Sequence, residues 1–127
     1  MPSVGNTIID FQEQVAQSIS FFSDGIGRYK VSVPFMFHDG GLFVIILKKE
    51  GPQWIFSDEG HTLMHCSSAM EGDSPPQRMM KRILPLFQVQ NRNGELILPI
   101  EDKQYSDAFW RFMQAIIALV SIERRYA

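Results

Sequence analysis

The chain has 127 residues and a mass of 14.6 kDa, and hydrophobic residues make up 45% of it. This length fits one domain, and this composition supplies enough apolar surface for a folded core, which excludes a disordered tail. The formal net charge of −2 argues against a protein that holds nucleic acid through one strongly basic face.

Location and domain count follow from similar arguments. A single cysteine, Cys66, cannot form an internal disulfide, which favours a reducing compartment. The N-terminal residues lack the pattern of a signal peptide, and the longest apolar stretch, residues 115–120, is too short to span a bilayer. We therefore expect a single cytoplasmic domain over residues 1–127, with no membrane contact and no cofactor.

The first predicted element is an amphipathic helix capped by Asn6 or Thr7. Apolar residues recur every three or four positions from Ile8 to Phe22, and the glycines of residues 23–27 end the helix.

Three strands are predicted next. Residues 29–33 alternate between apolar and polar, residues 42–47 form an apolar run, and residues 54–56 are large and apolar. Asp39 and Gly40 supply a tight hairpin turn between the first two strands. These segments predict an antiparallel meander.

Two short helices and a hairpin follow. Residues 61–70 lack Pro and Gly and predict the first short helix, and Ser74 caps the second, which ends near Pro85. The pair Asn93 and Gly94 predicts the turn of a small hairpin.

The last predicted element is a long helix over residues 105–125. Its apolar stripe consists of Phe109, Phe112, Met113, Ile116, Ile117 and Val120. Trp54, Trp110 and Phe109 are expected in the core. The order of elements predicts an α+β fold, in which an antiparallel sheet (a three-stranded meander plus a small hairpin) is packed by the N-terminal helix and the long C-terminal helix.

The stretch WIFSDEGHTLMH, residues 54–65, has a structural interpretation. Ser57 or Asp58 can accept hydrogen bonds from the N–H groups that begin a helix, and Gly60 permits the turn from strand to helix. Thr62 is a second candidate cap. On this interpretation the stretch is a structural junction, together with the turn at Asp39 and Gly40.

The same stretch has a catalytic interpretation. His61 and His65 are four residues apart, so they share one face of a helix and could ligate a metal with Asp58, while His38 lies on the facing turn. The dense signatures of metal sites are missing, however, and the metal-dependent hydrolase is kept only as an alternative.

Other catalytic patterns are incomplete. A metal-dependent nuclease needs a carboxylate followed by an acid-x-Lys triplet, whereas here Asp39 is followed by Lys48, Lys49 and Glu50, in the wrong order. No G-x-S-x-G nucleophile elbow occurs in the sequence. We therefore assign no catalytic residues and do not expect an enzyme.

One small basic face is predicted. Arg78, Lys81 and Arg82 stand at i, i+3 and i+4 of a helix, so they can contact phosphate or an acidic partner. A solvated helix face is the favoured interpretation, since the chain is acidic overall, and a nucleic-acid-associated accessory module is a further alternative.

Several segments together resemble a bacterial and phage family, domain of unknown function 1828. They are VPFMFHDGGLFVIIL, WIFSDEGHTL, NGELILPI and FMQAIIAL, spread over roughly residues 28–122. The residues that match the family's pattern are Pro34, Phe35, Asp39, Gly40, Asp58, Gly60, Thr62 and Leu63. Ser57 stands where the family usually has Thr, and Phe56 where it usually has Leu.

The resemblance implies a small domain carried by mobile elements, with no established reaction and no catalytic residues to transfer. It favours proteins that act by binding, such as phage inhibitors of host defence complexes. We expect a non-enzymatic interaction protein of phage or mobile-element type that binds a protein partner, for instance as an inhibitor or regulator of a host defence or nuclease complex. We expect it to be a monomer or homodimer.

Overall fold

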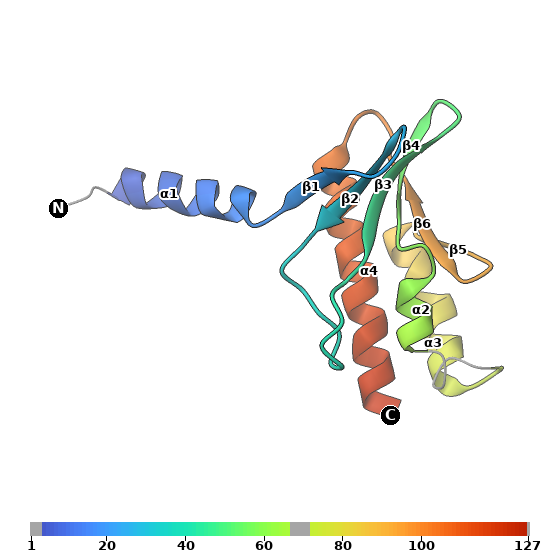
Figure 1. Cartoon of the computed structure of the whole chain (residues 1–127). Coiled ribbons are helices and arrows are strands. Elements are labelled where there is room, and N and C mark those ends of the chain that lie inside the picture. Colours follow the sequence, from blue (N-terminus) through green and yellow to red (C-terminus); the bar gives the residue numbers. More distant parts are fainter. Residues whose placement is uncertain (1–3, 67–71, 127) are drawn as a thin grey trace.

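The computed structural model describes residues 4–66 and 72–126 (Figure 1). The helices are α1 (Val4–Gln17), α2 (His61–His65), α3 (Pro75–Ile83), the 3-10 turn η1 (Leu84–Phe87) and α4 (Tyr105–Tyr126). The strands are β1 (Ser20–Ser23), β2 (Arg28–Ser32), β3 (Ile45–Glu50), β4 (Gln53–Ser57), β5 (Gln90–Arg92) and β6 (Glu95–Pro99).

The six strands form one antiparallel sheet in the order β1-β2-β3-β4-β6-β5. The predicted meander corresponds to β2, β3 and β4, and the predicted hairpin corresponds to β5 and β6. Asn93 and Gly94 turn this hairpin with φ angles of 55° and 94°, which a hairpin of this kind requires. The α+β fold class is confirmed.

Helix α4 covers one face of the sheet. Leu47, Phe56 and Leu98 are cross-strand neighbours on that face, and the ring of Phe56 lies 6.1 Å from that of Phe112 on α4. Phe112 is almost fully buried. Burying such side chains gives about 1.5–3 kcal/mol each, so this interface is the main source of stability.

The N-terminal region differs from the sequence expectation. The apolar period suggested one helix as far as Phe22, but α1 ends at Gln17 and residues 20–23 pair with β2 as an extra edge strand. Pairing with an existing strand satisfies the backbone there better than an unsupported helical turn would.

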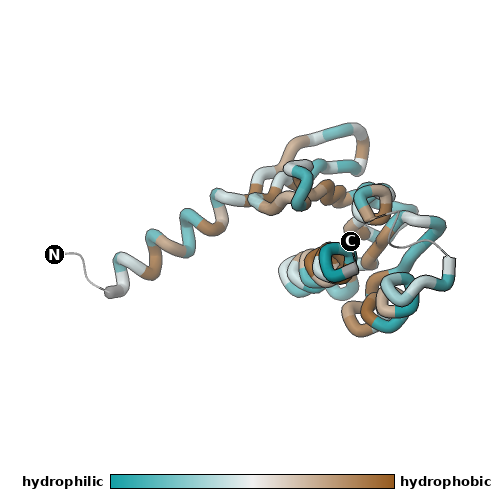
Figure 2. The backbone as a smooth tube through the Cα atoms, turned by 90° about the horizontal axis from the view of Figure 1, so that it is seen from below, coloured by the Kyte–Doolittle hydropathy of each residue, from teal (hydrophilic) through white to brown (hydrophobic). Residues whose placement is uncertain are grey.

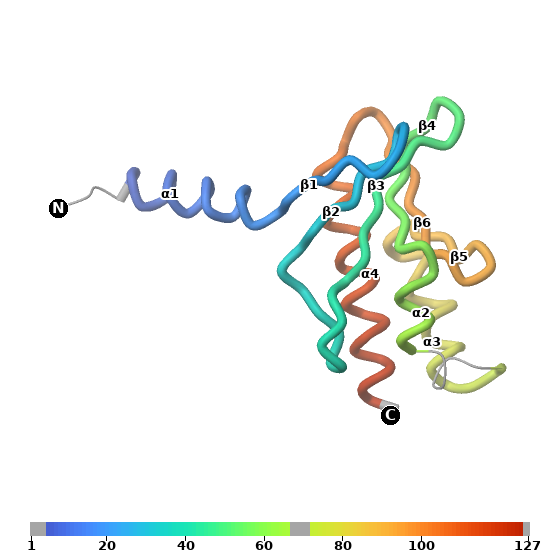
Figure 3. Tube along the Cα trace, viewed as in Figure 1, coloured from blue at the N-terminus to red at the C-terminus, as the bar shows by residue number. Residues whose placement is uncertain are grey.

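Helix α1 also does not pack on the sheet. It projects away from the rest of the chain (Figures 1 and 3), and residues 5–18 are exposed. Hydrophobic and hydrophilic segments alternate along this projecting helix (Figure 2).

The link between β2 and β3 is an arm, residues 33–44, and not a two-residue turn. The turn at Asp39 and Gly40 lies at its tip, where Phe37 N–H donates to the Gly41 carbonyl at 2.7 Å and Gly40 has a φ of 90°. Phe37 and Phe43 are buried at 3% and 6% exposure, and these aromatic anchors hold the arm against the core.

The short helices begin as predicted. Ser74 accepts the Gln77 N–H at the start of α3, which confirms the predicted cap. Helix α2 ends at His65 with Cys66 after it, and residues 67–71, the rest of the predicted helix, lie outside the described residues.

On α4 the core assignment was right for Phe109 but wrong for two residues. Trp110 and Ile117 are 47% and 40% exposed. They are seven residues apart, which is about two turns, so both lie on the same side of α4, outside the centre of the buried stripe. Among the described residues, no helix is both long and apolar enough to cross a bilayer.

Candidate functional site

Asp58 organises the junction between β4 and α2. The residue is fully buried. Its Oδ1 accepts the N–H groups of Gly60 at 2.8 Å and Leu96 at 2.9 Å, and its Oδ2 accepts that of Thr62 at 3.1 Å. Gly60, with a φ of 84°, makes the sharp turn that presents these donors. Asp58 is therefore a structural anchor of this turn.

Ser57 connects this junction to a network of charges. Its hydroxyl donates to Glu95 at 2.5 Å and accepts the Glu59 N–H at 2.9 Å. The charge network consists of Asp24, Arg28, Lys48, Glu50, Glu59, Arg92 and Glu95. Because side chains alternate between the two faces along a strand, the members of the charge network that belong to strands lie on the sheet face opposite α4.

Hydrogen bonding within the network shifts pKa values. The bidentate contact from Arg28 is the main reason that the pKa of Glu59 lies below its ordinary value. Burial raises the pKa of Glu95, but hydrogen bonds from Lys48, Ser57 and Arg92 outweigh that effect and lower it to about 2. These carboxylates are already engaged with protein cations, so the network is a structural clamp.

The histidine side chains do not form one site. His38 Nδ1 lies 3.5 Å from Glu123 Oε2, whereas His65 Nδ1 donates to Asp39 at 2.7 Å. The ring of His65 also stacks on Phe37 at 4.0 Å. The structure thus gives these two histidines different partners.

Asp58 directs its carboxylate to backbone donors, so it does not join His61 or His65 as a ligand. Within residues 4–66 and 72–126, no three His, Cys, Asp or Glu side chains are close enough to hold a metal ion.

Cys66 is not an activated nucleophile. It is buried, and burial, followed by the nearby charge of Glu123, raises its pKa to about 11. A thiol with that pKa is protonated at neutral pH and therefore unreactive.

The basic residues Arg78, Lys81 and Arg82 are exposed on α3, as the helical spacing predicted. Arg78 donates to the carbonyl of Asp73 at 2.6 Å, and the Asp73 carboxylate lies 3.6 Å away. Contact of this face with phosphate stays a prediction.

An apolar trough runs between the sheet and the first half of α4. It consists of adjoining depressions that share lining residues. We define the trough by the shared residues Ile19, Leu47, Trp54, Tyr105, Phe109 and Trp110. Its central depression has a volume of about 310 Å³ and is lined almost entirely by apolar side chains.

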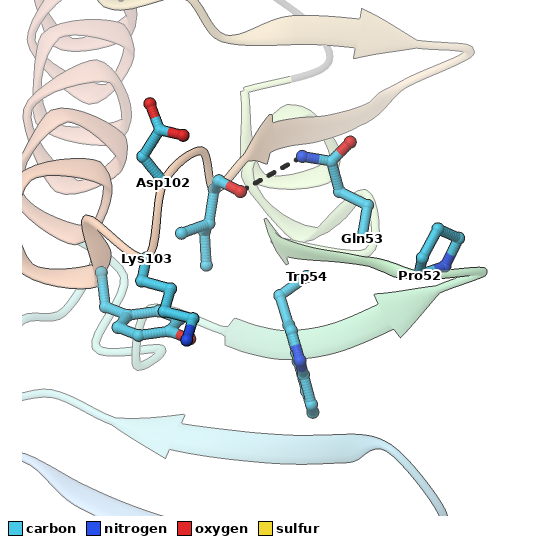
Figure 4. A pocket seen from close by; sticks show the side chains of 7 residues that line it. Pro52, Gln53, Trp54, Asp102 and Lys103 are labelled. Atoms are coloured by element: carbon cyan, nitrogen blue, oxygen red, sulfur yellow. Dashed lines mark hydrogen bonds between the residues drawn. The ribbon is translucent and has the colours of Figure 1, made fainter.

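One end of the trough is more polar, as Figure 4 shows. There Gln53 donates to the Ile100 carbonyl at 3.2 Å, beside Trp54 and the side chains of Asp102 and Lys103. The other end reaches the last turn of α1, where Val15 contributes to the lining. The trough therefore has a polar mouth and a long apolar floor, a shape suited to an amphipathic segment.

The sequence contained one signal for this surface. Trp110 lies outside the buried stripe of α4, and a large aromatic residue outside the apolar stripe of an amphipathic helix indicates a second apolar contact. Phe21, which also lines the central depression, gave no such signal, because it fell within the segment predicted as the first helix.

The sequence pattern of a family described as "Domain of unknown function DUF1828" matches residues 33–119, well over half of the chain. The chain belongs to this family. No curated protein and no solved structure matches it.

Some of the surfaces just described lie within the residues that match DUF1828, and others lie before them. It contains the junction at Asp58, Trp54 at the polar mouth and Trp110 on the trough wall. It begins at Val33, so α1, β1 and β2 lie before it. The family's description names no activity, so function must be argued from the surfaces of this chain.

Proposed function

We propose that this DUF1828 protein is a non-enzymatic interaction protein that binds a protein partner through the apolar trough. The observation that carries the proposal is the trough itself, a row of adjoining depressions whose central one is apolar and lies beside the half-exposed Trp110. An exposed apolar surface of this kind costs solvation free energy unless a partner covers it, and partially exposed tryptophans are the commonest anchors of such contacts.

The mode of binding follows from shape and polarity. A trough with an apolar floor and polar mouth accepts the apolar face of an amphipathic helix. By contrast, the carboxylates of the charge network are held by protein cations, which argues against their use in catalysis.

The narrower predictions, that the protein comes from a phage or mobile element and acts on a host defence complex in the cytoplasm, stay predictions. The metal-dependent hydrolase and the nucleic-acid module are not favoured by any arrangement among the described residues.

Affinity capture tests the proposal. Tagged wild-type protein and a Trp110→Asp variant are used with lysate of the organism that carries the gene, followed by quantitative mass spectrometry. We expect a protein that wild type enriches and the variant loses by at least about tenfold, because a buried charge at a binding anchor costs more than about 1.4 kcal/mol. The captured protein is then purified and its binding measured by calorimetry.

The matched control is Gln114→Asp, which adds the same charge to an exposed position of α4 outside the trough. It should retain capture. The proposal is wrong if wild type captures no protein above the background of beads that carry no tagged protein. It is also wrong if both variants capture the same proteins as wild type.

A further inference from the structure

We infer that the apolar trough is occupied by α1 of a second copy of this chain, so that two copies exchange their N-terminal helices in a symmetric dimer. This inference rests on the proposed function, because it names the partner of the same trough.

The first observation is the apolar stripe of α1. Ile8, Phe11 and Val15 recur at helical spacing and are 53%, 66% and 39% exposed. The acidic residues Asp10 and Glu13 lie on the opposite side of the helix. A 14-residue helix is marginal in water without packing, so this stripe needs a partner to hold it.

The second observation is the direction of α1. Ser18 N–H donates to the Gln14 carbonyl at 3.0 Å, its hydroxyl caps the Val15 carbonyl at 2.5 Å, and β1 begins at Ser20. Folding α1 back over its own trough would break these bonds in a connection of two residues. Reaching a neighbouring copy requires no such change, since α1 already points outward (Figure 1).

The third observation is the match between helix and trough. Val15 at the end of the stripe contributes to one end of the trough, so stripe and trough form one continuous apolar surface. A two-fold axis beside this point lets each stripe lie in the other copy's trough, which is the self-complementary interface of a symmetric dimer. Asp10 and Glu13 would then remain in water.

The fourth observation is the amount of exposed surface. The chain exposes 8164 Å², whereas a compact monomer of its mass is expected to expose about 6,900 Å². The excess is about 1,260 Å² per chain, so two chains could bury about 2,500 Å², as much as stable homodimer interfaces bury.

Light scattering after size exclusion, on the full-length chain over a range of concentrations, tests the dimer. Wild type should have the mass of two chains. Phe11→Asp, which puts a charge in the stripe, and Trp110→Asp, which puts one in the trough, should each raise the dimer dissociation constant by at least about tenfold. Gln17→Asp and Gln114→Asp add the same charge outside both surfaces and should remain dimeric.

Mixing the two defective variants tests exchange between copies. The Phe11→Asp chain keeps a good trough and the Trp110→Asp chain keeps a good helix, so one of the two contacts is restored in a mixed dimer. Differently tagged copies should therefore co-purify when mixed, although each variant alone is monomeric. Their thermal unfolding checks that both remain folded.

The inference is overturned if wild type is monomeric at every concentration. This holds whether hydrogen exchange finds the α1 amides exposed to solvent or protected by contacts within the same chain. It is also overturned if Phe11→Asp leaves the dimer intact. A monomer that still captures another protein through Trp110 would refute the exchange and leave the proposed function standing. A dimer that captures no other protein would support the exchange and identify the second copy as the partner of the trough.

Discussion

At the residue scale, Asp58 shows how one side chain holds a junction that its neighbours cannot hold alone. The segment after β4 must turn sharply into α2, which leaves backbone N–H groups without partners. The carboxylate of Asp58 accepts hydrogen bonds from Gly60, Thr62 and Leu96 while fully buried. The bond to Leu96 ties the turn to β6, far along the chain.

Asp58→Ala should therefore destabilise the fold strongly. It leaves several buried donors unsatisfied, and we expect the free energy of unfolding to fall by about 3 kcal/mol, measured by urea denaturation. Asp10→Ala on exposed α1 is the control and should change it by less than about 0.5 kcal/mol. Equal stability of the two variants would contradict the anchoring role.

The histidines illustrate the limit of arguments from spacing. Their four-residue separation places His61 and His65 on neighbouring turns of one helix, as predicted from the sequence. The partner of His65 is Asp39, however, which comes from the arm between β2 and β3. Spacing along one helix carries no information about which side chain a distant loop brings to it.

At the scale of elements, the charge network clamps four strands and the junction. Lys48 on β3 contacts Glu95 on β6 at 2.8 Å, and Arg92 on β5 reaches Glu50 on β3 at 2.6 Å. These contacts cover buried apolar side chains on the face of the sheet opposite α4, including Ile46, which is 2% exposed. The stems of long charged residues can cover apolar surface in this way.

The network predicts a dependence of stability on pH. The pKa of Glu95 is about 2 in the folded chain, against an ordinary value of 4.5. The unfolded chain therefore takes up this proton first as pH falls, so the contribution of Glu95 is complete above about pH 4.5 and is lost between about 4.5 and about 2. Chemical denaturation across this range measures the loss.

Glu95→Gln should flatten this part of the profile, because the amide does not titrate, and should lower stability at pH 7 by weakening the contacts with Lys48 and Arg92. The exposed Glu13→Gln variant should keep the wild-type slope. If Glu95→Gln has the same slope as wild type, the lowered pKa is not what stabilises the fold.

At the scale of the whole molecule, the chain combines a half-covered sheet with a helix that covers nothing. Helix α4 lies over one part of the sheet face, and the trough marks the part that it leaves open. The chain's second-longest helix, α1, projects into solvent (Figure 3). Exchange between two copies would complete both surfaces at once.

Exchange predicts that thermal stability depends on protein concentration. Association stabilises the folded state by mass action, so the Tm of wild type should rise as the protein is concentrated, which differential scanning calorimetry measures. The Tm of Phe11→Asp should be constant over the same range. A wild-type Tm that does not change with concentration would argue against a dimer coupled to folding.

Local signals in the sequence determined the α+β class, the meander, the Asn93-Gly94 hairpin, the Ser74 cap and the buried stripe of α4. Each depends on residues close together in the chain, for which hydrophobic periodicity and turn preferences are enough to predict the structure. The tertiary structure alone decided that residues 20–23 join the sheet, that α1 leaves it, and that Trp110 faces the trough. Those outcomes depend on which surface, distant in the chain, buries a given apolar side chain. Amphipathic periodicity shows that an apolar stripe must be buried, but it does not show which part of the structure buries it.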